Sequence, residues 1–209
     1  MMKVNKVEHP LLDVKISLLR NVETDSKSFR DILEEVSTFL AYEALKDIKV
    51  KEIKINTPVK KNATGYSLDE KVIIVPIFRA GLGMVNGVTS LFPQIKVGHI
   101  GIYRDDNTNK TSIYYNKLPK SIKGAKVLVL DPMLATGSTI IDSINLIKES
   151  GPSSISVLSV VAAPEGIKKL ESVHPDVELV VGSIDEKLDK NGYISPGLGD
   201  AGDRIFGTK

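Results

Sequence analysis

The sequence predicts an α/β fold in which helices cover both faces of a parallel β-sheet. The first observation is an alternation of strand-like and helix-like segments between residues 72 and 184, which is typical of parallel sheets. The second is that the strand segments are continuous apolar runs, as expected where both faces of a sheet are buried. The third is size and composition, since 209 residues with 42% hydrophobic residues can bury a substantial core. We therefore expect a single domain over residues 1–209, with a core at about 70–184.

The segments before this core are expected to pack against it. Residues 1–24 contain only short apolar groups. Asp25, or the serine after it, can cap a helix whose apolar side chains fall on one face and which should run to about Ile48. Residues 50–55 alternate charged and apolar residues, which is typical of a half-exposed strand, and residues 58–70 are polar and predict a loop.

Five strands are expected in the core. They are predicted at residues 72–78, 97–103, 127–130, 155–162 and 177–184. The first should end near Pro76, because proline cannot donate a hydrogen bond to a central ladder. Of the helices between the strands, one should end near Phe92, one at Gly151 before a proline, and one should span residues 165–173. Residues 105–118 are polar and include two adjacent tyrosines, which predicts a mobile hairpin or flap.

One strand–loop–helix unit carries the strongest functional signal. The apolar strand at residues 127–130 leads into residues 131–139, here named the phosphate loop, and then into isoleucines at helical spacing. Backbone N–H groups, small hydroxyl residues and a helix dipole would converge there, which suits a phosphate. The lysine of a Walker A loop and the three glycines of a Rossmann loop are both missing. An ordinary turn of small residues is the simpler alternative.

The C-terminal loop, residues 192–207, has an unusual composition. It holds five of the chain's 16 glycines, interspersed with Tyr, Ile, Leu, Pro and Phe. Glycine lets a backbone press close to a ligand, whereas flexible linkers are rarely built with large apolar residues between their glycines. We therefore expect an ordered binding loop in this segment.

Charged residues follow three of the predicted strands. They are Arg79, Arg104 and Asp131. Ligands of parallel sheets bind at the carboxyl ends of the strands, and arginine offers forked donors to phosphate oxygens. The sequence therefore predicts a polyphosphate site at this edge of the sheet.

These motifs resemble, in the same order, those of the uracil phosphoribosyltransferases, a family of type I phosphoribosyltransferases. The motifs that carry the resemblance are His9-Pro10-Leu11, Arg79-Ala80-Gly81-Leu82, Tyr103-Arg104-Asp105, residues 131–137 and residues 192–207. The resemblance implies the type I phosphoribosyltransferase fold, a five-stranded parallel sheet flanked by helices. To this it adds a flexible flap and a hood formed by the N-terminal and C-terminal segments, including the C-terminal loop.

The resemblance also implies an enzyme of pyrimidine salvage. It would transfer the phosphoribosyl group of 5-phosphoribosyl-1-diphosphate (PRPP) to uracil, giving UMP and diphosphate, with Mg²⁺ carried as Mg-PRPP. PRPP binding is implied for Arg79, Arg104, Asp131, Pro132, Met133, Leu134, Ala135, Thr136, Gly137, Ser138, Thr139 and Asp200. Uracil binding is implied for Ile194, Gly199, Asp200 and Ala201. Catalysis is implied for Arg79, Arg104 and Asp200, which would stabilise charge and position the substrates without a covalent nucleophile.

Two positions depart from the family pattern. Asp131 is a single acid where many type I members carry two, so no metal-ligating residue is assigned to the protein itself. Ser138 stands where many uracil enzymes have a second glycine, which predicts a weaker or differently shaped phosphate contact.

Composition limits the partners. The chain has no cysteine, which excludes disulfides and thiolate chemistry, and its three histidines do not stand at metal-ligand spacing. A net charge of +2 with interspersed signs gives no reason to expect nucleic-acid or membrane binding. No signal peptide or long apolar run is present, so a cytoplasmic protein is expected. The resemblance adds a homo-oligomer, dimer or tetramer, and GTP as a candidate allosteric effector.

Three alternatives remain open from the sequence. A phosphoribosyltransferase for purines or orotate would share the phosphate loop, although orotate would want a cation near its carboxylate and Arg204 is the only one in the C-terminal loop. A regulatory protein that senses nucleotides and binds RNA should show a basic face. A plain structural α/β domain would leave the arginines and the glycine-rich C-terminal loop unexplained.

Overall fold

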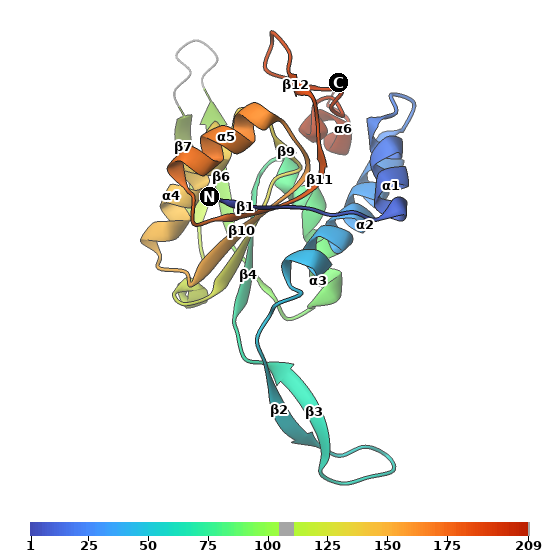
Figure 1. Ribbon diagram of the computed structural model, residues 1–209, viewed down its shortest axis with the longest axis vertical. Helices are drawn as coiled ribbons and strands as arrows, with labels where there is room; N and C mark the ends of the chain where they lie inside the picture. The colour runs from blue at the N-terminus through green and yellow to red at the C-terminus, as the bar shows by residue number, and fades with distance from the viewer. Residues whose placement is uncertain (105–110, 209) are drawn as a thin grey trace.

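A path of seven strands forms the main sheet of the computed structural model, which describes residues 1–104 and 111–208 (Figure 1). In order across the sheet they are β1 (Lys3–Lys6), β11 (Glu178–Ile184), β10 (Ser154–Ala162), β8 (Lys126–Leu130), β4 (Val72–Phe78), β6 (His99–Arg104) and β7 (Thr111–Lys117). Neighbours pair in parallel except β6 and β7, which pair antiparallel. Two short strands join this sheet, β5 (Lys96–Val97) beside β4 and β9 (Met133–Leu134) beside β10.

The five predicted strands form the parallel centre of the sheet, and the structure adds a strand at each edge. β1 has the sequence KVNK, which is too short and polar to carry a strand signal. β7 occupies part of the segment predicted as a mobile hairpin or flap, and its antiparallel pairing with β6 agrees with a hairpin. Residues 105–110 lie outside the described residues, so the predicted mobility is not tested. The prediction that β4 ends near Pro76 is wrong, because β4 continues to Phe78. Proline is tolerated there since β6 pairs with β4 only from Ile77 onward.

Helices lie on both faces of the sheet (Figure 1). One face carries α1 (Pro10–Arg20), α2 (Ser26–Ala44), the short 3-10 helix η1 (Ala80–Met84) and α3 (Val85–Leu91). The other carries α4 (Ser138–Glu149) and α5 (Pro164–Val173). The Asp25 side chain caps α2 by accepting from the backbone N–H of Ser28, as predicted, although α2 ends at Ala44 and not near Ile48. No described helix is both long and apolar enough to cross a membrane.

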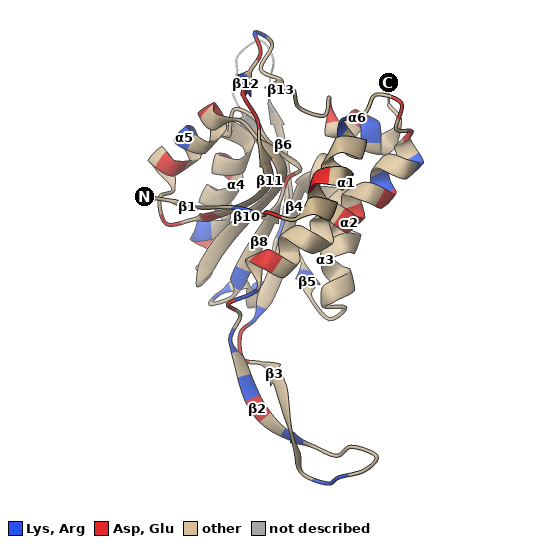
Figure 2. Cartoon of the chain, turned by 45° about the vertical axis from the view of Figure 1, so that its right-hand side comes forward, with Lys and Arg blue, Asp and Glu red and all other residues tan. Residues whose placement is uncertain are grey.

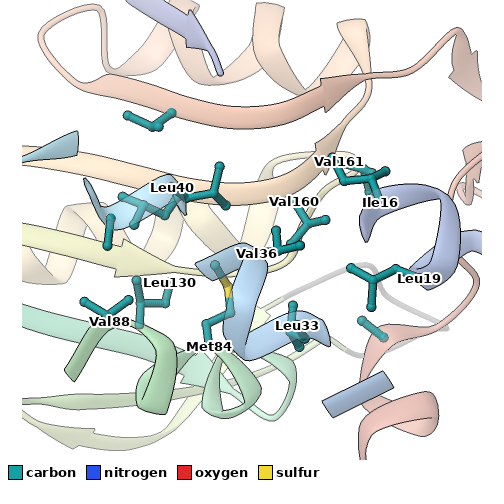
Figure 3. Packing of buried hydrophobic residues seen from close by; sticks show 14 of the residues in the cluster. Ile16, Leu19, Leu33, Val36, Leu40, Met84, Val88, Leu130, Val160 and Val161 are labelled. Carbon is teal, nitrogen blue, oxygen red and sulfur yellow. The ribbon is translucent and has the colours of Figure 1, made fainter. Parts of the chain in front are cut away.

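Each strand of the centre contributes side chains to two hydrophobic cores. In β8, Leu128 and Leu130 belong to the core under α1, α2 and α3, while Val127 and Val129 belong to the core under α4 and α5. Figure 3 shows the first core, in which Val36 and Leu40 of α2 lie near Leu130, Met84 and Val88. Burial on both faces explains why these strands are continuously apolar.

A β-hairpin projects from the body as an arm (Figures 1 and 2). It consists of β2 (Val50–Ile55) and β3 (Ala63–Leu68), which pair antiparallel. The prediction of a loop over residues 58–70 is wrong for β3, because an exposed strand of sequence ATGYSL has no apolar face to reveal it. Lysines and acids are interspersed over the arm and the helices (Figure 2).

Candidate active site at the carboxyl ends of the strands

The phosphate loop begins directly after β8 and stays attached to β10. The carbonyl of Pro132 accepts hydrogen bonds from the backbone N–H groups of Val160 and Val161, at 3.0 and 3.1 Å. Gly137 is the N-cap of α4 and has a φ of 78°, a left-handed conformation that favours glycine. The predicted passage from strand through a tight loop to a helix N-terminus is therefore confirmed.

The residues of the phosphate loop differ in exposure. Pro132, Leu134 and Gly137 are buried, and the Leu134 carbonyl accepts a hydrogen bond from Ala163 N–H at 2.9 Å. The side chains of Pro132 and Leu134 thus anchor the loop in the interior of the protein. The partly exposed members are Asp131, Met133, Ala135, Thr136, Ser138 and Thr139.

Two glycines let neighbouring segments closely approach the phosphate loop and the end of the strand before it. A Cβ on Gly166 of α5 would lie 2.2 Å from the Ala135 carbonyl oxygen, and a Cβ on Gly81 would lie 2.2 Å from the Leu130 carbonyl oxygen. Both contacts are with backbone, which has little room to move. Gly81 belongs to a predicted motif, whereas Gly166 was not singled out by sequence, because only the packing of α5 on the loop reveals its role.

Arg79 connects the end of β4 with the C-terminal helix α6 (Ala201–Phe206). Its Nη2 lies 3.1 Å from Oδ1 of Asp203, and its guanidinium lies 5.8 Å from the centre of the Phe206 ring. The side chain remains half exposed. Arg104 ends β6, with its backbone paired to Thr111, but its side chain lies outside the described part of the chain, so its predicted role stays a prediction.

Asp131 occupies the position predicted to face the ribose. Burial of the carboxyl raises its pKa to about 7, and a hydrogen bond from Met133 N–H to Oδ1, at 3.2 Å, lowers it only in part. A carboxyl with this pKa changes its protonation state near neutral pH. It can therefore become ionised when hydroxyl donors of a ligand arrive.

Ser138, one of the two positions that depart from the pattern of the resembled family, has a neighbour that the sequence did not reveal. Lys169 of α5 donates a hydrogen bond from Nζ to Ser138 Oγ, at 2.7 Å. Because the ammonium occupies an acceptor position of the hydroxyl, the Ser138 O–H stays available as a donor. The two residues are 31 positions apart in sequence, and the pairing depends on the packing of α5 against α4.

The C-terminal loop is ordered and lies beside the phosphate loop. It contains β13 (Ile194–Ser195), which pairs with β12 (Lys187–Leu188), and the helix α6, which Asp200 caps by accepting from Asp203 N–H at 2.9 Å. A cavity of about 240 Å³ lies between the two loops. It is lined by Met133 and Ala135 from the phosphate loop and by Asn191, Gly192, Tyr193, Ile194 and Asp200.

Of the four residues predicted to bind uracil, Ile194 and Asp200 line this cavity, whereas Gly199 and Ala201 do not. Gly199 and Asp200 line a second cavity of about 490 Å³, and Ala201 is fully buried. A cavity of about 420 Å³ at the start of β4, lined by Val72 and Phe92 among others, contains no predicted site residue. We therefore place the site by its chemistry, at the 240 Å³ cavity.

Arg204 holds the C-terminal loop to the connection between α1 and α2. Its guanidinium donates to the carbonyls of Leu198 at 2.9 Å and Asn21 at 2.7 Å, and it lies 4.4 Å from the centre of the Phe29 ring. A guanidinium bound to backbone carbonyls is not free to bind a carboxylate. The cation that an orotate site would need is therefore engaged elsewhere.

Comparisons with known proteins agree with this geometry. The family model described as uracil phosphoribosyltransferase matches residues 6–208. The uracil phosphoribosyltransferase of Clostridium botulinum (strain Hall) is 52% identical over 209 residues, covering all of both chains. That of Ureaplasma urealyticum serovar 10 is 51% identical over 203 residues, covering 97% of this chain and 98% of the other.

Solved structures give the same result. The AQ2163 protein of Aquifex aeolicus has a TM-score of 0.93 and 40% identity, with 97% of each chain covered. A hypoxanthine-guanine phosphoribosyltransferase of Bacillus anthracis shares the fold alone, with a TM-score of 0.51 and 12% identity over 75% of this chain and 79% of the other. The α/β fold is thus that of the type I phosphoribosyltransferases, and the chain belongs to the uracil phosphoribosyltransferase family.

Proposed function

We propose that this chain transfers the phosphoribosyl group of PRPP to uracil, giving UMP and diphosphate for pyrimidine salvage. The observation that carries the proposal is the 240 Å³ cavity, because one wall comes from the phosphate loop and the other from the C-terminal loop. Such a cavity can bring a ribose and a base together. Membership of the family supports the same reaction.

The phosphate loop supplies the PRPP side. The N-terminus of α4 and the hydroxyls of Thr136, Ser138 and Thr139 would hold the 5-phosphate. Asp131 would accept hydrogen bonds from the ribose hydroxyls. Arg79, and Arg104 at the end of the neighbouring strand, would neutralise the diphosphate.

The C-terminal loop supplies the base side. Uracil presents an N–H donor between two carbonyl acceptors, which a backbone carbonyl flanked by N–H groups in residues 199–201 can match. Ile194 would pack on the ring, and Asp200, fixed as the cap of α6, would reach PRPP. Cytosine would leave buried backbone groups unpaired, which can reduce its use by about 10⁴-fold.

The chain's own groups act by positioning and by charge stabilisation. Breaking the bond between C1 of the ribose and the diphosphate builds oxocarbenium-like charge on the ribose. The two loops align the base with that carbon. Arg79 and Arg104 stabilise the departing diphosphate, and no covalent nucleophile takes part.

Magnesium fits the proposal as a companion of PRPP. Among the described residues, no group of three or more His, Cys, Asp or Glu side chains could hold a metal ion. Diphosphate and ribose oxygens are the hard donors that Mg²⁺ prefers, so the ion would be carried by PRPP. When bound, the ion supplies positive charge to the diphosphate.

A homo-oligomer is the state we propose for this enzyme. The arm exposes Val50, Val59 and Tyr66, with Val59 96% exposed. Since an isolated two-stranded hairpin is marginally stable in water, the arm would gain stability by packing on another copy. The substitution Val59→Asp should lower the mass measured by analytical ultracentrifugation. The size of the oligomer, dimer or tetramer, stays a prediction. Activation by GTP and a cytoplasmic location stay predictions as well.

Ligand binding tests the division of the site. The variant Ile194→Ala should weaken UMP binding about tenfold, because it removes apolar contact with the base, while ribose 5-phosphate binding stays the same. The variant Thr136→Val should weaken both ligands. Val59→Ala on the arm is the matched control and should change neither. Equal loss of both ligands in Ile194→Ala, measured by titration calorimetry, would contradict the division.

A further inference from the structure

Asp185, directly after β11, forms a partly buried ion pair with Arg20, the last residue of α1. The Asp185 side chain is 1% exposed. Arg20 donates from Nη1 to Oδ2 at 2.7 Å and from Nη2 to Oδ1 at 2.6 Å. This forked geometry matches a guanidinium to a carboxylate. Neither residue belongs to the motifs that carry the family resemblance.

The same ion pair binds both backbone polar groups of Gly197. Arg20 Nη1 donates to the Gly197 carbonyl at 2.7 Å, and Gly197 N–H donates to Asp185 Oδ2 at 2.9 Å. Gly197 has a φ of +61°, and a Cβ there would lie 2.1 Å from the Ile194 carbonyl oxygen. The turn from Ile194 to Gly197 is therefore tight, and one ion pair holds its end.

This turn connects the two parts of the base side. Ile194 precedes it and lines the cavity, and residues 199–201 follow it. A shift of Gly197 would move both parts relative to the phosphate loop. The phosphate loop is attached instead to β10 and α5, so it does not depend on the ion pair.

The fold does not depend on Arg20 for the placement of α1. Leu12, Ile16 and Leu19 of the same helix are buried in the first core. Burial alone would raise the pKa of Asp185, but hydrogen bonds from Arg20, Gly197 and Ser183 lower it below its ordinary value. The pair thus stays charged over the pH range of an assay.

We propose that Arg20 and Asp185 are positioning residues for base recognition. They fix the C-terminal loop at the distance from the phosphate loop that allows uracil to bind. The proposal deepens the proposed function and rests on it. Part of the base specificity would then depend on an ion pair whose two residues are more than 160 positions apart in sequence. Neither of these residues belongs to the C-terminal loop.

Steady-state kinetics of Arg20→Lys tests the proposal. A lysine ammonium keeps the charge, but as a point charge it cannot reproduce the fork to both Asp185 oxygens and the Gly197 carbonyl. We expect KM for uracil to rise at least about tenfold, KM for PRPP to change less than about twofold, and the preference for uracil over cytosine to fall. Asp185→Asn should act in the same direction. Lys15→Met is the matched control and should change none of these, because it alters the same helix as Arg20→Lys but removes only a surface ion pair with Glu35 of α2.

The outcomes separate this inference from the function itself. Absence of UMP formation by the wild-type enzyme would contradict the proposed function. An active wild type with an unchanged Arg20→Lys variant, or a variant in which both KM values rise equally, would contradict the inference alone. If Asp185→Asn does not fold, Arg20→Lys decides. Failure of Arg20→Lys to fold would also count against the inference, since the apolar face of α1 is expected to hold the helix in place.

Discussion

The two loops that form the site are held in different ways. The phosphate loop is fixed by β10 and α5, the strand and helix that follow it within about 35 residues along the chain. The C-terminal loop is fixed by Arg20, 177 residues before Gly197, and by the bond of Arg204 to Asn21, 183 residues away. The phosphate loop can therefore be recognised from its own sequence and that of its neighbours in the chain. The C-terminal loop depends for its conformation on residues that are distant in sequence.

Two aspartates that follow strands of the main sheet, Asp131 after β8 and Asp185 after β11, show the same contrast. Asp131 has one backbone N–H as a hydrogen-bond donor, and burial raises its pKa to about 7. Asp185 is more deeply buried than Asp131, but hydrogen bonds from Arg20 and two other donors lower its pKa. We infer that Asp131 can change its protonation state when a ligand binds, and that Asp185 stays ionised.

Arg79→Met should have the largest effect, because Arg79 joins the two regions. Loss of the guanidinium removes charge stabilisation of the departing diphosphate, so kcat/KM for PRPP should fall by about 10²- to 10³-fold. Asp203→Asn is the control: it removes the ion pair with Arg79 but keeps the guanidinium, and an exposed pair is worth at most about 1 kcal/mol. A loss of equal size in both variants would show that Arg79 acts only by holding α6.

Gly166→Ala should disturb the phosphate side alone. The added Cβ would meet the Ala135 carbonyl at 2.2 Å, which should cost about 1–3 kcal/mol of stability and displace the loop enough to lower kcat/KM for PRPP about 100-fold. Lys168→Ala, an exposed position on the same helix, should leave stability and activity unchanged. Urea denaturation and the two KM values measure this; a rise in KM for uracil alone would contradict the separation of the regions.

Asp131→Asn should flatten the pH dependence of PRPP binding. With a pKa of about 7, the ionised fraction of Asp131 rises about tenfold between pH 6 and pH 8, and KM for PRPP should fall by a similar factor. The substrate phosphates also titrate near pH 6, so the variant is the reference. An identical pH profile in both enzymes would exclude Asp131 as a ligand in its ionised form.

The same substitution should change stability with a defined sign. The pKa of Asp131 is higher in the folded state, so the wild type loses stability as pH rises from about 4 to about 7. Asp131→Asn should therefore be similar to the wild type at pH 4 and more stable at pH 7.5, by roughly 4 kcal/mol at most. Urea denaturation across this range measures the difference, and a constant difference would contradict the raised pKa.

The smallest effect is expected at Lys169. Lys169→Met should raise KM for PRPP about threefold at low salt, because the ammonium acts on the phosphate across the Ser138 hydroxyl and is screened by salt. In a Ser138→Gly background the same substitution should have less effect, since the hydroxyl between them is gone. Equal effects in both backgrounds would show that the hydrogen bond between Lys169 and Ser138 is not part of the phosphate site.

Sequence predicted the elements with a local signature. The five central strands and the phosphate loop follow from apolar runs and small residues that are adjacent in the chain. It did not predict β1 or β3, because short polar strands at an edge or on an arm have no buried face. Gly166, Lys169, Arg20 and Asp185 were not singled out, because their partners are set by packing between distant segments. The expectation for Arg104 as a diphosphate ligand is still to be tested.

The most direct test of the roles of the two loops is diphosphate release from Mg-PRPP. Release is measured with uracil, cytosine, orotate, hypoxanthine or no base. We expect release with uracil only, since the phosphate loop holds PRPP and the C-terminal loop selects the base. Release with another base in place of uracil would leave the phosphate loop in its role and contradict the role of the C-terminal loop. No release with any base would contradict the enzyme function.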